Sequence, residues 1–100
     1  MLATQSMIKA GADHAATGEN AVKVACRTAD VIVGPVGIVI ADSLWGEITP
    51  EMALAVSQSN AERILLPMNL CSNYIVGVNQ TSTSKMVEEC VARIVFLKNR

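Results

Sequence analysis

Aromatic residues are scarce in this chain, and basic residues are few. Only three of its 100 residues are aromatic whereas 51% are hydrophobic, so any core has to be built from Val, Ile, Leu, Ala and Met. The formal net charge is -1, and apart from Lys98 and Arg100 the basic residues are scattered singly. A nucleic-acid-binding surface needs a basic stripe. The sequence therefore argues against a nucleic-acid partner.

Long hydrophobic runs are also missing. The longest apolar stretch, residues 31–41, contains two glycines and a proline, and it is far shorter than the roughly 20 residues that span a bilayer. The N-terminus lacks the basic and apolar regions of a signal peptide. We therefore expect a cytoplasmic protein with no membrane partner.

The cysteines show no metal-binding or redox spacing. Cys26, Cys71 and Cys90 form no CxxC pair, and an odd number at wide spacing is typical of reduced thiols rather than of a disulfide framework. No neighbouring base supports a nucleophilic cysteine. We therefore expect no metal site.

The hydrophobic residues that are present follow strand and helix patterns. β-Branched runs predict buried strands at residues 31–33, 64–66 and 74–78. The apolar stretch after the turn at residues 34–37 predicts a buried helix over residues 36–45. Further helices are expected over residues 1–10, 18–28 and 50–56, with Thr17 and Thr49 as N-caps. The apolar repeat of three and four over residues 86–97 predicts a last helix.

Strands that alternate with helices are typical of βαβ units and a parallel sheet. We expect one domain over residues 1–100, with an α/β fold and a three-layer, Rossmann-like open sheet that is mainly parallel. Three strands are few for such a sheet, so either two chains share strands or the complete domain is longer at its N-terminus. The apolar composition also predicts self-association, as a dimer or a higher homo-oligomer.

Several motifs resemble one known family. The segments ATGENA (residues 16–21), ADVIVGPVGIVIADS (29–43), GEITPEMA (46–53) and ILLPMN (64–69) follow one another in order. From Ala3 onward the chain resembles an uncharacterised bacterial family, common in clostridia, that is known only as a domain of unknown function. The resemblance implies a Rossmann-like fold but no activity. Members of that family begin with a strand and a glycine-rich turn that have no counterpart here, which implies a chain truncated at its N-terminus.

Ligands in open α/β sheets bind beyond the carboxyl ends of the strands. The turn at residues 34–37 follows the first predicted strand, and Asn69 follows the second. Backbone amides around Val36 and Gly37 open a predicted helix and suit an anion, while Asn69 suits a base or a sugar. The alternative is that both glycines only allow a tight turn and close helix packing.

The polar loop at residues 17–20 is the second candidate site. Glu19 suits a ribose hydroxyl or the role of a base, with Thr17 and Asn20 positioning the ligand. The alternative is purely structural, with Thr17 as an N-cap and Glu19 beside the helix dipole. The predicted ligand-binding residues are therefore Thr17, Gly18, Glu19, Asn20, Gly34, Pro35, Val36, Gly37 and Asn69.

Three function hypotheses follow. The favoured one is a small-molecule or nucleotide-binding module that takes a nucleotide or a small polar metabolite. The second is a homo-oligomeric interaction protein without a ligand, in which the helix over residues 36–45 forms the interface through Ile38, Leu44 and Trp45. The third is a small enzyme with Asp13, His14 or Glu19 as acid or base, although adjacent side chains such as Asp13 and His14 seldom point the same way. The sequence identifies no reaction and no cofactor.

Overall fold

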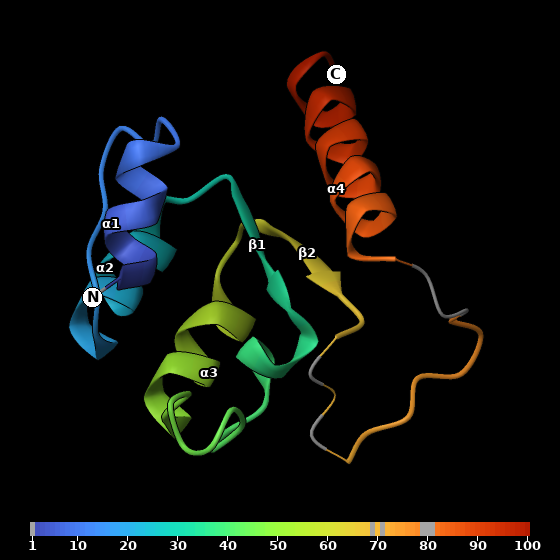
Figure 1. The fold of residues 1–100 in the computed structure, drawn as a ribbon. Helices are drawn as coiled ribbons and strands as arrows, with labels where there is room; N and C mark the ends of the chain where they lie inside the picture. Colours follow the sequence, from blue (N-terminus) through green and yellow to red (C-terminus); the bar gives the residue numbers. More distant parts are fainter. Residues whose placement is uncertain (1, 69, 71, 79–81) are drawn as a thin grey trace.

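The chain folds as an α/β protein, and its computed structural model describes residues 2–68, 70, 72–78 and 82–100. Helices and strands alternate through its central part (Figure 1). In order, the elements are α1 (Leu2–Lys9), α2 (Glu19–Thr28), β1 (Val31–Pro35), the 3-10 helix η1 (Val36–Val39), α3 (Pro50–Gln58), β2 (Glu62–Leu66) and α4 (Thr83–Lys98).

The two strands form a parallel pair, as the sequence predicts. Val31 lies opposite Glu62 at one end of the pair, and Pro35 lies opposite Leu66 at the other. From the end of β1 the chain returns through η1 and α3 to the start of β2, which is the crossover that parallel neighbours require. Both strands therefore end at the same edge of the sheet. Val36 is the first residue after β1, and Pro67 is the first residue after β2.

Helices α2 and α3 pack side by side and run in the same direction. At their first turns, the hydroxyl of Thr49 donates a hydrogen bond to the Glu19 carboxylate. At their last turns, Ser59 Oγ donates to the Cys26 carbonyl at 2.8 Å. Because α3 starts beyond the carboxyl end of β1, both helix N-termini lie toward that edge of the sheet.

The buried core is small and lies mainly around α3 and β2. The buried hydrophobic side chains are Ile48, Ala53, Val56, Ala61, Leu66 and Cys90. Among the described residues, no large side chain is completely buried. Helix α4 lies on the other side of the strands from α1 and α2 (Figure 1) and contributes only Cys90 to the buried set.

The prediction of a helix over residues 36–45 is wrong. Helical geometry is limited to η1, and residues 41–47 form turns in which Asp42, Leu44 and Trp45 have φ angles of 65°, 56° and 58°. The hydroxyl of Ser43 donates to the Gly37 carbonyl and holds the turns against η1. The apolar composition of this stretch suits a half-buried turn as well as a helix, and its β-branched residues resist helix formation.

Two smaller predictions are also corrected. Residues 74–78 are irregular rather than a strand, with Tyr74 and Val76 almost fully exposed and Gly77 in a left-handed turn at φ 84°. The N-cap of α2 is Gly18 rather than Thr17, whose hydroxyl is hydrogen-bonded to that of Thr4. In contrast, Thr49 caps α3 as predicted, because its side chain accepts from the Met52 amide at 3.2 Å.

Candidate ligand-binding cleft

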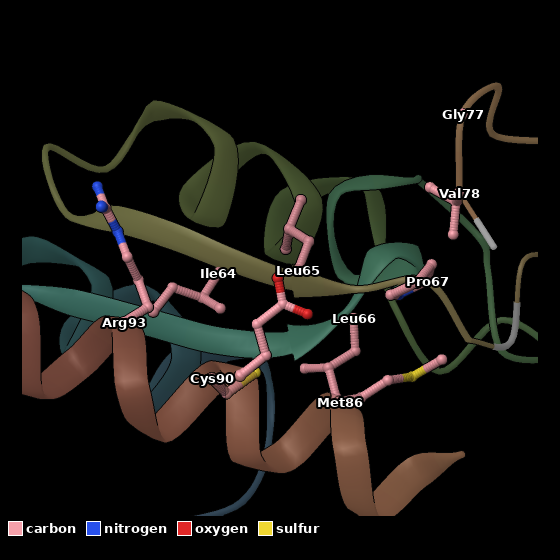
Figure 2. Close-up of a pocket in the computed structure, with 10 residues that line it drawn as sticks. Ile64, Leu65, Leu66, Pro67, Gly77, Val78, Met86, Cys90 and Arg93 are labelled. Carbon is pink, nitrogen blue, oxygen red and sulfur yellow. The ribbon is translucent and has the colours of Figure 1, made fainter. Parts of the chain in front are cut away.

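A cleft of about 570 Å³ opens between β2 and α4 (Figure 2). It lies where Pro67 leaves the carboxyl end of β2, and residues 77 and 78 border it from the following loop. Its volume falls within the roughly 300 to 1,000 Å³ of small-molecule sites. Its lining residues are Ile64, Leu65, Leu66, Pro67, Gly77, Val78, Met86, Glu89, Cys90 and Arg93.

The walls of the cleft are apolar. Met86 and Cys90 lie one turn apart on α4, so both project from the face of the helix that looks toward β2. Figure 2 shows the Met86 side chain and that of Leu66 pointing toward one another. Leu66 and Cys90 are both buried. These walls suit a flat apolar group such as an aromatic ring.

Two charged residues of α4, Glu89 and Arg93, add polar groups to the cleft. Arg93 is held by Glu62 at the start of β2, since Nε donates to Oε2 at 2.7 Å and Nη2 to Oε1 at 2.8 Å. The Arg93 guanidinium also lies 5.1 Å from the Phe96 ring centre. The hydrogen bond from Arg93 lowers the pKa of Glu62, and the same bond raises the pKa of Arg93. The guanidinium therefore has two defined partners, the Glu62 carboxylate and the Phe96 ring.

The Cys26 thiol shows no sign of activation. Cys26 and Cys90 are free, and burial raises the pKa of Cys26, which keeps its thiol protonated. Cys71 lies outside the described residues. Within those residues, no three His, Cys, Asp or Glu side chains gather in a group that could hold a metal ion.

Residues of the predicted turn at 34–37 make structural contacts within the fold. A Cβ atom at Gly34 would lie 3.0 Å from Ile38 Cδ1, so the glycine permits close packing of η1 on β1. Gly37 is buried, and its carbonyl accepts from Ser43 Oγ and from the Ile40 amide. These contacts agree with the alternative of a tight turn and close packing. Ligand binding by Gly34, Pro35, Val36 and Gly37 stays a prediction.

The loop at residues 17–20 lies at the same edge of the sheet, and some of its side chains already have hydrogen-bond partners within the fold. Glu19 is bonded to Thr49, and Gly18 has the left-handed φ of 111° at the N-cap of α2. Thr17 and Asn20 are exposed, as are Asp13 and His14 in the preceding loop. The parallel strands bring the predicted turn to the same edge as Pro67. Asn69 lies outside the described residues.

Local sequence patterns do not reveal the residues that give the cleft its charge. Glu89 and Arg93 stand outside the apolar repeat of α4, so the repeat does not mark them as lining residues. Arg93 and Glu62 are 31 positions apart, and no local spacing relates them. The repeat did identify Met86 and Cys90 as facing inward.

A second cavity, of about 320 Å³, opens between β1, α2 and α3. Its lining consists of Val22, Ala25, Cys26, Ala29, Val31, Ile32, Ile38, Ile48, Met52 and Val56. Small-molecule sites combine apolar walls with a few polar groups that orient the ligand. Because this cavity has almost no polar lining, the β2–α4 cleft is the better candidate.

Comparison with known proteins gives a family but no activity. Residues 1–98 match the family described as Domain of unknown function (DUF3842). No curated protein and no solved structure matches the chain. Of the helices that the structure describes, none combines the length and the hydropathy needed to cross a bilayer.

Proposed function

Because the chain belongs to the family of domains of unknown function DUF3842, we propose its function from geometry alone: it is a small-molecule-binding α/β module. Its ligand is a nucleoside-sized polar metabolite held in the β2–α4 cleft. The observation that carries the proposal is the position of this cleft, at the carboxyl end of a parallel strand, where α/β folds bind their ligands. The cleft therefore lies at the edge of the sheet where ligands of α/β folds are expected.

The lining of the cleft suits a planar ring with a polar edge. Leu66 and Met86 offer apolar surface to such a ring. The carboxylate of Glu89 accepts hydrogen bonds from ring or amino N–H groups. Arg93 donates from the nitrogen that Glu62 does not engage. A nucleoside base presents both kinds of partner on a single edge.

The balance of charge disfavours a polyphosphate. Glu62 and Glu89 bring two negative charges to this region, whereas Arg93 brings one positive charge that Glu62 already engages. Two like charges about 4 Å apart repel by about 1 kcal/mol in water and by more where water is excluded. A nucleoside or another uncharged metabolite therefore fits better than a nucleotide triphosphate.

A thermal-shift experiment with paired variants tests this proposal. Val78 lines the cleft and Val76 does not, so Val78→Phe fills the site and Val76→Phe is the matched control. Adenosine, guanosine, cytidine and uridine are each added at millimolar concentration, and each is compared with its triphosphate. We expect at least one nucleoside to raise the melting temperature of the wild type and of Val76→Phe but not of Val78→Phe. No shift with any nucleoside, or an equal shift in Val78→Phe, would overturn the proposal.

We also propose a more specific architecture for the domain. A parallel strand pair with helices on both sides supports a Rossmann-like, three-layer arrangement of the family domain. The cytoplasmic location stays a prediction from the sequence.

A further inference from the structure

Helix α4 carries a second apolar face that nothing in the described structure covers. We call Val87, Val91 and Ile94 the outer stripe. Their exposed fractions are 48%, 53% and 38%, and Val95 beside them is 50% exposed. The inward residues of the same helix, Met86, Cys90 and Leu97, are half-buried or buried.

The outer stripe has the spacing of a helix-pairing surface. Its members are separated by four and then three residues, so they form one row along the helix. Since successive residues are about 100° apart around a helix, this row lies beside the inward row rather than behind it. One face of α4 therefore looks toward β2 across the cleft, while the adjacent face with the outer stripe is exposed.

Charges beside the outer stripe differ between its two ends. Glu88 is next to Val87 at the N-terminal end, and Lys98 continues the row one turn after Ile94 at the C-terminal end. Both charged residues are exposed. If a second α4 packed in the same direction, Glu88 would face Glu88 and Lys98 would face Lys98. In the opposite direction, each Glu88 faces a Lys98.

We propose that a second copy of this chain binds the outer stripe, with the two α4 helices antiparallel. A two-fold axis then passes between Val91 and Ile94, so that Val91 of each copy packs against Ile94 of the other. Such an interface is self-complementary, which is the property of two-fold homodimers. Apolar residues form its centre, and the Glu88–Lys98 pairs at its ends select the antiparallel direction.

This interface differs from the one predicted from the sequence. That prediction used a helix over residues 36–45, which the structure replaces with η1 and turns. Val91 does not line the β2–α4 cleft. Dimerisation and ligand binding can therefore fail independently.

Sedimentation velocity on the full chain at several concentrations tests the proposal. We expect the wild type to dimerise and Val91→Glu to be monomeric, because the new carboxylate would lie in the apolar centre of the interface. Leu54→Glu is the matched control, since Leu54 is also a helical residue and has the same 53% exposure. A monomeric wild type, or a Val91→Glu variant that dimerises as the wild type does, overturns the proposal.

Exchanging the two charges tests whether the α4 helices pair antiparallel. Both residues are exposed, so the substitutions should not disturb the folding of α4. Glu88→Lys and Lys98→Glu should each weaken the dimer by about tenfold, because each creates two like-charge contacts. The double variant Glu88→Lys/Lys98→Glu restores opposite charges and should dimerise within a few-fold of the wild type. Circular dichroism confirms that each variant keeps its helix content. If the double variant dimerises no more tightly than either single variant, the antiparallel arrangement is overturned. This holds whether the helices pair in parallel or α4 contacts a different partner.

Discussion

Arg93 in the middle of α4 and Glu62 at the start of β2 are joined by two hydrogen bonds of 2.7 and 2.8 Å. They form the one salt bridge that is found among the described residues. Helix α4 contributes only Cys90 to the buried core, and this pair adds a polar contact between α4 and β2. Arg93 also lines the proposed ligand-binding cleft, so the pair lies at the border of that cleft.

Replacing Glu62 with Gln should loosen α4 more than the rest of the chain. Glutamine keeps the length of the side chain but loses the charge that makes these hydrogen bonds strong. In hydrogen–deuterium exchange at neutral pH, we expect faster exchange in α4 and unchanged exchange in α2 and α3. Equal protection of α4 in both proteins would contradict this role.

The same pair should make stability depend on pH in a defined direction. Arg93 lowers the pKa of folded Glu62, so the folded state binds this proton less readily than the unfolded state does. The stabilisation is complete above the ordinary glutamate pKa of about 4.3 and is lost as the pH falls through the lowered value. In urea unfolding, the stability difference between wild type and Glu62→Gln should therefore shrink from pH 6 to pH 3. A difference that grows toward low pH would contradict the assignment.

Thr49 should matter more for stability than an ordinary helix cap. Its hydroxyl oxygen accepts from the Met52 amide and its proton is donated to Glu19, so one side chain caps α3 and ties it to α2. We expect Thr49→Ala to lower the free energy of unfolding by about 2 kcal/mol. Ser82→Ala, which removes only the exposed cap of α4, should cost about 1 kcal/mol. Equal losses in urea unfolding would mean that the Glu19 contact adds nothing.

Gly34 should tolerate a side chain only when Ile38 becomes smaller. The Cβ of alanine would lie 3.0 Å from Ile38 Cδ1, an atom that valine lacks. We expect Gly34→Ala to destabilise the fold by about 1 to 3 kcal/mol, as other overpacked substitutions do. Ile38→Val should recover part of that loss in a double-mutant cycle measured by urea unfolding. Strictly additive effects would show that Ile38 is not the obstacle.

Trp45 should be replaceable by glycine without loss of stability. Its side chain is fully exposed and its φ is 58°, a left-handed conformation that costs most residues about 1 to 2 kcal/mol. Trp45 therefore does not anchor packing within the chain, and its role in a subunit contact stays a prediction from the sequence. We expect Trp45→Gly to raise the urea midpoint slightly at micromolar concentration. A clear decrease that depends on protein concentration would instead place Trp45 in an interface.

The sequence predicted the elements whose boundaries are marked by local signals. The β-branched run at residues 31–33 between Asp30 and Gly34 gave β1, Thr49 and Pro50 gave the start of α3, and the regular apolar repeat gave α4. Residues 36–45 were misassigned because apolar composition alone does not separate a helix from a buried turn. Residues 74–78 resemble a strand locally, but a strand also needs a neighbour to accept its hydrogen bonds.

The candidate site was harder to predict than the fold. The predicted parallel pairing of the strands is confirmed, and it places the turn after β1 at the same edge of the sheet as the end of β2. The charged lining of the cleft depends on the approach of α4 to β2, which brings together residues 31 positions apart. Pairing over such a distance follows from the packing of whole elements, and a single sequence does not record it.

The parallel alignment of α2 and α3 has an electrostatic consequence for the edge of the sheet. Both helices direct the positive ends of their dipoles toward that edge, and the Glu19 carboxylate lies between them. The chain thus places its own carboxylate at helix N-termini, a position that favours anions. An incoming anion would first have to displace this internal carboxylate, so the edge around α2 and α3 is already neutralised before any ligand approaches.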